Sequence, residues 1–153
     1  MLKYIATLFA LLTPLSMAHA HCQIPCGIYD DSMVFTQLEQ HITTIEKSMQ
    51  EIASADNTHD ITRWTVNKEE HAQKIQDIMA QYFLAQRLKP DVTNYLPQLM
   101  RIHQITIDAM KAKQTTDLKY VESLRMLVDS YEKLYYAPHE HKDAPKDKPK
   151  DKE

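Results

Sequence analysis

The sequence predicts an all-α protein built as an antiparallel four-helix bundle, with a short N-terminal segment of different character in front of it. Two observations predict this class. The 153 residues include one glycine, Gly27, whereas a β-rich protein of this size needs many turns, and turns usually need glycine. Apolar residues also recur three and four positions apart along four stretches, which is the spacing of one face of an α-helix. Helices joined by short loops pack as antiparallel neighbours.

The first and clearest helix is predicted from Ser32 to about Ala53. Asp31 or Ser32 is expected to cap its start, because either side chain can accept a hydrogen bond from a backbone amide of the first turn. The apolar stripe of this helix consists of Phe35, Leu38, Ile42, Ile45, Met49 and Ile52. Residues 54–57 are predicted to form the turn that follows.

The second helix is predicted from about Asp60 to Phe83, with a polar interruption over 67–71. Its apolar residues are Ile61, Trp64, Ile75, Ile78, Met79 and Tyr82. Pro90 marks the next loop, and Asn94 is expected to cap a third helix. The stripe of the third helix is Leu99, Ile102, Thr106 and Met110, and that of the fourth is Leu118, Val121, Leu124, Val128, Tyr131 and Tyr135.

The first 20 residues have the features of a secretory leader. Lys3 provides the positive start, and the apolar run from Ile5 to Leu12 is too short to span a bilayer. Ala18-His19-Ala20 fits the small-x-small rule for cleavage. We therefore expect residues 1–20 to be removed, so that the mature chain starts at His21. An uncleaved membrane anchor or an N-terminal core helix is the alternative.

The other end of the chain and the overall charge exclude several roles. Residues 137–153, rich in Pro, Lys and Asp, carry too little apolar surface to fold, so a disordered charged tail is expected after a bundle over 31–136. The formal net charge of −3 gives no electrostatic footprint for nucleic acid. An anionic substrate would have to be attracted locally.

Residues 21–30 carry the candidate chemistry, because both cysteines of the chain lie there. Leader removal would free the α-amine of His21, which adjoins the amide nitrogen and thiol of Cys22. Cys26 can turn back and add a second thiolate. Such a planar set of two nitrogens and two sulfurs, with the His21 imidazole along the axis, suits Ni(II) or Cu(II). Tyr29 can stand over the open face and offer its hydroxyl.

Other readings of the two cysteines stay open on spacing alone. Exported cysteines usually form a disulfide, and the Cys-x3-Cys spacing permits one. The Cys-x-x-Cys-His motif of haem attachment is absent. A tetrahedral zinc site would need two further ligands, for which His41, His59 and His71 are candidates without paired spacing.

The segment resembles the nickel hook of nickel-containing superoxide dismutases, His-Cys-x-x-Pro-Cys-Gly-x-Tyr directly after a processing site. The match covers His21, Cys22, Pro25, Cys26, Gly27 and Tyr29. The resemblance implies a homohexamer of four-helix bundles with a nickel ion as cofactor. It also implies the disproportionation of superoxide to oxygen and hydrogen peroxide by Ni(II)/Ni(III) cycling.

By position, the resemblance implies that nickel is bound by the amine and imidazole of His21, the amide nitrogen and thiolate of Cys22, and the thiolate of Cys26. These three residues and Tyr29, which would gate small anions, are the expected catalytic residues. Gln23 departs from the Asp that is frequent after the first cysteine of the hook.

The chain also departs from the family at the residues that would hold the His21 imidazole. A Glu on the first helix has this role in the best-known members, and Gln37 stands in its place here, with Glu39 nearby. An Arg that joins it is replaced by His71. Because such partners orient a metal-binding imidazole and set its basicity, these three residues are the candidates for that role.

Two other classes of function remain as alternatives. One is an exported helical protein that binds or delivers a metal without turnover, and the other is a structural bundle with a Cys22–Cys26 disulfide. The leader indicates a periplasmic or secreted protein. Removal of the leader by a dedicated protease in the cytoplasm would give the same N-terminus.

Overall fold

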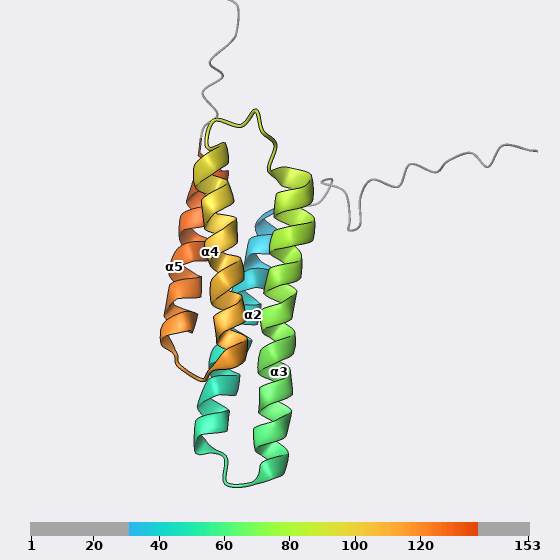
Figure 1. Cartoon of the computed structure of the whole chain (residues 1–153), viewed down its shortest axis with the longest axis vertical. Helices are drawn as coiled ribbons and strands as arrows, with labels where there is room; N and C mark the ends of the chain where they lie inside the picture. The colour runs from blue at the N-terminus through green and yellow to red at the C-terminus, as the bar shows by residue number, and fades with distance from the viewer. Residues whose placement is uncertain (1–30, 138–153) are drawn as a thin grey trace, which may run out of the picture.

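The structure, a computed structural model, describes residues 31–137; the expected leader, the segment over 21–30 and the tail from 138 lie outside the described residues. Within the described part the chain is helical and contains no strand. The elements are α2 (Asp31–Ser54), α3 (Thr58–Asp77), the π-helix η1 (Ile78–Arg87), α4 (Tyr95–Gln114) and α5 (Lys119–Tyr135). Since η1 directly continues α3, these elements form the four rods of a bundle (Figure 1), which confirms the predicted fold class.

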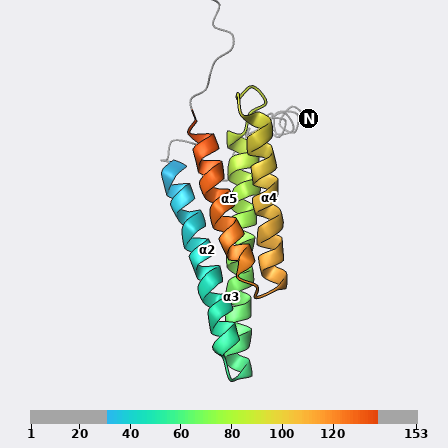
Figure 2. The same cartoon turned by 90° about the vertical axis from the view of Figure 1, so that its left-hand side faces the viewer.

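The four rods form two antiparallel hairpins. α2 packs on α3 and α4 packs on α5, and contacts of α3 with α4 and of α2 with α5 close the bundle. The α2–α3 hairpin extends past the turn that joins α4 to α5 (Figures 1 and 2). At the opposite end of the bundle, the start of α2 meets the last turns of η1 and α5. Asp31, the first described residue, therefore lies at this end of the bundle.

The predicted stripes of the first and fourth helices form much of the core. On α2 and α5 the buried apolar residues are Phe35, Leu38, Ile42, Ile45, Met49, Val121, Leu124, Val128 and Tyr131. Phe83 of η1 lies among them, with its ring centroid 5.0 Å from Phe35 and 4.9 Å from Tyr131. The prediction is wrong for Leu118, which is 39% exposed at the start of α5.

The predicted stripe of the third helix is partly wrong. Ile102 is buried as expected, but Thr106 and Met110 are only half-buried. Ala109 and Ala112 are fully buried in their place, together with Ile105. Alanine side chains are short enough for α4 to approach its neighbours closely, so the buried face of this helix carries less apolar bulk than its sequence suggests. Asn94 precedes α4, but its side chain makes no capping hydrogen bond.

The second helix also differs from its prediction. It begins at Thr58, where the Asn57 side chain accepts a hydrogen bond from the Asp60 amide at 2.9 Å. It continues to Arg87 as a π-helix, and the Leu88 amide donates to the Phe83 carbonyl five residues earlier at 2.8 Å. Extended π-helices are rare and are frequent at functional sites. Here η1 carries two of the residues that hold the start of α2.

No helix in the 31–137 region combines the length and the apolar character that crossing a membrane requires.

Candidate functional site

The four residues predicted to carry the chemistry lie just ahead of the described residues: His21, Cys22, Cys26 and Tyr29. The structure describes the start of α2, the helix to which their segment is joined. A chain spans at most about 3.6 Å per residue, so Cys26, five positions before Asp31, lies within about 18 Å of the start of α2. The side chains around the start of α2 are therefore the part of the described structure that is joined most directly to this segment.

The carboxylate of Asp31 accepts hydrogen bonds from three side chains of other elements. Arg87 Nη2, at the end of η1, donates to Oδ1 at 2.6 Å, and Tyr135 Oη, at the end of α5, donates to Oδ2 at 2.6 Å. Tyr82 Oη donates a further short hydrogen bond to Oδ1 and accepts one from Arg87 Nη2 at 2.8 Å. We call these four residues the Asp31 cluster.

The Asp31 cluster is largely withdrawn from water. The side chains of Asp31 and Arg87 are only 21% and 20% exposed. Burial alone would raise the pKa of Asp31, but the hydrogen bonds from Tyr135, Tyr82 and Arg87 and the charge of Arg87 outweigh it and lower that pKa. Burial and the hydrogen bond to Asp31 raise the pKa of Tyr135. Asp31 is therefore ionised and both tyrosines keep their protons at neutral pH.

Sequence reasoning did not predict this cluster. Asp31 or Ser32 was expected to cap the first helix, and the structure adds that the Asp31 carboxylate binds side chains of η1 and α5. Arg87 and Tyr135 are 56 and 104 positions away. No local spacing signals such a pairing, because it depends on the packing of the bundle.

A pair of histidines joins α2 to α3. His41 Nδ1 lies 3.0 Å from His71 Nδ1, and the rings meet edge to face with their centroids 4.9 Å apart. Burial lowers the pKa of both imidazoles; His71 and Lys74 lower that of His41 further, and Lys74 lowers that of His71, against an opposite effect of Glu70. The short contact between two Nδ1 atoms means that one donates and the other accepts.

The three candidate partners of the His21 imidazole lie in different surroundings. Glu39 is directed toward α5, where Arg125 Nε lies 3.7 Å from its carboxylate. His71 is on α3 and contacts His41. Gln37 is exposed one helical turn before His41. The structure thus separates Glu39, on the α5 side of α2, from His71, on the α3 side.

Comparison with known proteins identifies the family. The family model described as nickel-containing superoxide dismutase matches residues 16–139. The chain belongs to this family. It is therefore a nickel-dependent superoxide dismutase, an oxidoreductase with superoxide as its substrate.

Individual relatives agree with this assignment. The nickel superoxide dismutase of Streptomyces coelicolor is 30% identical over 106 residues, which is 67% of this chain and 72% of the relative. That of Streptomyces seoulensis is 28% identical over 112 residues, 70% of this chain and 79% of the relative. A native nickel superoxide dismutase structure has a TM-score of 0.64 at 22% identity and covers 76% of this chain and 97% of its own. The structure of a partially X-ray-reduced nickel enzyme is equally similar, at 0.64 and 22%, over 76% and 96%.

Among the residues from 31 to 137, no three or more His, Cys, Asp or Glu side chains are grouped so that they could hold a metal. Two of the three candidate zinc ligands, His41 and His71, do meet, whereas His59 is exposed at the start of α3. The proposed nickel ligands, His21, Cys22 and Cys26, lie outside the described residues.

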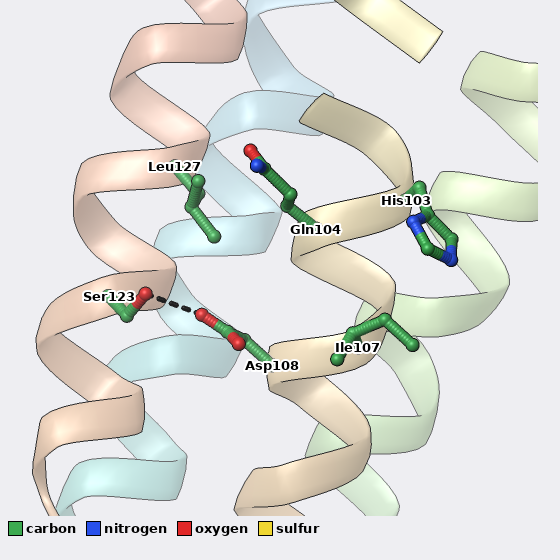
Figure 3. A pocket seen from close by; sticks show the side chains of 6 residues that line it. All are labelled: His103, Gln104, Ile107, Asp108, Ser123 and Leu127. Atoms are coloured by element: carbon green, nitrogen blue, oxygen red, sulfur yellow. Dashed lines mark hydrogen bonds between the residues drawn. The ribbon is translucent and has the colours of Figure 1, made fainter. Parts of the chain in front are cut away.

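A shallow pocket lies between α4 and α5, outside the Asp31 cluster and the histidine pair. It is lined by His103, Gln104, Ile107, Asp108, Ser123 and Leu127. Figure 3 shows that Ser123 of α5 points to Asp108 of α4 and binds its carboxylate. Asp108 already has this partner, and the pocket brings together no group that the dismutase reaction requires.

Proposed function

We propose that this superoxide dismutase holds its nickel ion in a hook formed by His21, Cys22 and Cys26 after removal of residues 1–20. The observation that carries the proposal is the order of the sequence, in which a small-x-small cleavage signal is followed at once by His-Cys-x-x-Pro-Cys-Gly-x-Tyr. This stretch lies within the residues that match the family model. The described helices, which lack a competing group of ligands, support it.

The proposed donors are the amine and imidazole of His21, the amide nitrogen and thiolate of Cys22, and the thiolate of Cys26. Nickel bound by such strong donors supplies one-electron chemistry by cycling between Ni(II) and Ni(III). The chain itself closes the hook through Pro25 and Gly27, and Tyr29 orders water and small anions near the open face. Burial of the hook protects its thiolates from the peroxide product.

We further propose that His71, and not Glu39, is the partner of the His21 imidazole. Glu39 is drawn toward Arg125 on α5. His71 uses its Nδ1 for His41, so its Nε2 is the ring nitrogen left to meet another imidazole. A partner of this kind fixes the tautomer and orientation of a metal-binding histidine.

The assembly and processing of the protein complete the proposal. We propose a homohexamer in which neighbouring subunits cover the hooks, and a leader protease that produces the His21 terminus. The leader favours a periplasmic or secreted enzyme, and a cytoplasmic protease acting on the same bond is the alternative. The oligomeric state follows from light scattering, and the compartment from fractionation of the source cells.

The decisive experiment is to measure superoxide decay with nickel-loaded protein that begins at His21. We expect activity together with one nickel per chain, and loss of both in Cys22→Ser and Cys26→Ser. The matched control keeps Ala20 ahead of His21, which leaves the helices unchanged and blocks the free amine. Full activity in this control or in either serine variant would refute the hook.

A further inference from the structure

Asp31 lies at the junction between the proposed nickel hook and the helical bundle. It is the first residue of α2 and follows Tyr29 by two positions and Cys26 by five. The first turn of a helix has backbone amides without intrahelical partners, and helix ends therefore fray readily. The Asp31 cluster opposes fraying here, because it ties the first residue of α2 to two other elements.

Both oxygens of this carboxylate are engaged, and from different directions. Oδ1 accepts from Arg87 and Tyr82 of η1, while Oδ2 accepts from Tyr135 of α5. Charge-assisted hydrogen bonds are about twice as strong as neutral ones. The start of α2 is thus fixed relative to the ends of η1 and α5, and a chain end that leaves from a fixed point explores less space than one that leaves from a frayed turn.

A second observation concerns the arginine of this cluster. Arg87 Nε is buried and has no hydrogen-bond partner within residues 31–137. Buried donors of this kind are almost always satisfied in native proteins. Arg87 also binds the Asp31 carboxylate at 2.6 Å, so a buried donor without a partner among the described residues belongs to the side chain that holds the first residue of α2.

We propose that Asp31 is a positioning residue for nickel binding: its hydrogen bonds with Arg87, Tyr82 and Tyr135 fix the start of α2, to which the proposed hook is joined. The inference rests on the proposed function, since it assumes that residues 21–26 bind the metal. Closing a planar chelate requires the His21 amine and the Cys26 thiolate to meet at one point. Because the start of α2 is fixed, less conformational entropy is lost when the amine and the thiolate meet.

The test compares nickel binding by the mature protein and by Asp31→Asn, which keeps the size of the side chain and removes its charge. Changes that disturb the orientation of metal ligands typically weaken metal binding 10- to 100-fold. We expect the nickel dissociation constant to rise about tenfold and the nickel–thiolate absorption to weaken, while the helical circular dichroism stays unchanged.

Two controls separate positioning from stability. Asp129→Asn makes the same chemical change in an exposed pair with Lys133 and should keep the nickel affinity of the parent protein. Lys68→Met is expected to destabilise the bundle at the C-terminal end of α4, where Lys68 has no contact with the Asp31 cluster. It should also keep the nickel affinity of the parent protein at temperatures where the protein is folded. The inference is overturned if Asp31→Asn binds nickel as the parent does, or if Lys68→Met weakens binding equally.

The remaining outcomes also decide the matter. If Asp31→Asn loses its helical signal, Tyr135→Phe takes its place, because it removes one of the three donors and leaves the charge. It should weaken nickel binding several-fold, and unchanged binding would overturn the inference. If the parent mature protein itself shows no nickel–thiolate absorption, the proposed hook fails and the positioning role with it. If the parent binds nickel and Asp31→Asn binds it equally well, the positioning role is refuted and the proposed hook is not.

Discussion

His41 and His71 are joined by a hydrogen bond between their Nδ1 atoms, 3.0 Å apart, across the interface of α2 and α3. The contact can exist only while at least one of the two facing nitrogens carries no proton. Burial, the neighbouring imidazole and Lys74 all favour the neutral form of His41, and only Glu70 opposes this at His71. The pair therefore links the packing of these two helices to pH.

The first prediction concerns the stability of nickel-free protein in mild acid. An unfolded histidine has a pKa of about 6.5, and both folded-state pKa values lie below it. The unfolded chain then binds more protons over this interval, so the histidine contribution to stability is complete above about pH 6.5 and declines as the pH falls below it. Thermal unfolding followed at pH 7.5, 6.5 and 5.5 should show this decline.

A variant identifies the groups responsible. His71→Gln should reduce the dependence of the unfolding temperature on pH, whereas His59→Gln, on an exposed histidine at the start of α3, should leave it unchanged. An equal slope in the parent and in His71→Gln would contradict the assignment to this pair.

The second prediction concerns Lys68, a buried lysine that closes the C-terminus of α4. Its Nζ donates to the carbonyls of Ala112 at 2.7 Å, Lys113 at 2.6 Å and Thr115 at 3.1 Å. The last carbonyls of a helix have no intrahelical partner and attract a positive charge. Lys68→Met leaves these buried acceptors unpaired, and we expect a loss of roughly 2–3 kcal/mol in the free energy of unfolding.

Urea unfolding measures this loss, with Lys133→Met as the control. Lys133 pairs with Asp129 at 2.6 Å, but its side chain is 74% exposed, and exposed pairs contribute about 0–1 kcal/mol. A cost for Lys68→Met no larger than that of the control would show that water satisfies the three carbonyls equally well.

The third prediction is a substitution that should stabilise the protein. Tyr131 is fully buried between Phe35 and Phe83, and its hydroxyl has no hydrogen-bond partner among the described residues. A buried polar group without a partner costs free energy. Tyr131→Phe removes this group and keeps the ring, so we expect stability to rise by about 1 kcal/mol.

The neighbouring tyrosine supplies the control for this substitution. The Tyr135 hydroxyl donates to Asp31, so Tyr135→Phe should lower stability by about 1–2 kcal/mol. Opposite signs for the two tyrosines would confirm the difference in their surroundings. A loss of stability in Tyr131→Phe would mean that its hydroxyl has a partner outside residues 31–137.

The sequence was sufficient where local periodicity decides the structure. On α2 the large apolar residues at three- and four-residue intervals are the ones that the core buries, from Phe35 to Met49. On α4 the same reasoning missed Ala109 and Ala112, which are buried. Closely packed helices bury small side chains, and a search for large apolar residues at regular spacing does not find these. The π-helix η1 was not predicted, since its hydrogen-bond pattern leaves no simple mark in the sequence.

The candidate site likewise has a part that the sequence predicts and a part that it does not. The hook is a continuous motif, and sequence is sufficient to propose it. The Asp31 cluster at the start of α2 depends on partners brought together by folding, such as Asp31 with Tyr135, 104 positions apart. Spacing alone offers no means to find such pairs, and for the same reason it could not choose between Glu39 and His71.

The last prediction tests that choice in the nickel-loaded enzyme. If His71 orients the His21 imidazole, His71→Ala should lower activity about 10- to 100-fold and change the electron paramagnetic resonance signal of the oxidised nickel. Glu39→Gln should preserve both, because this carboxylate lies toward Arg125 of α5. His59→Ala controls for the loss of an imidazole as such. Loss of the signal in Glu39→Gln, with His71→Ala unaffected, would assign the role to the first helix and exclude His71.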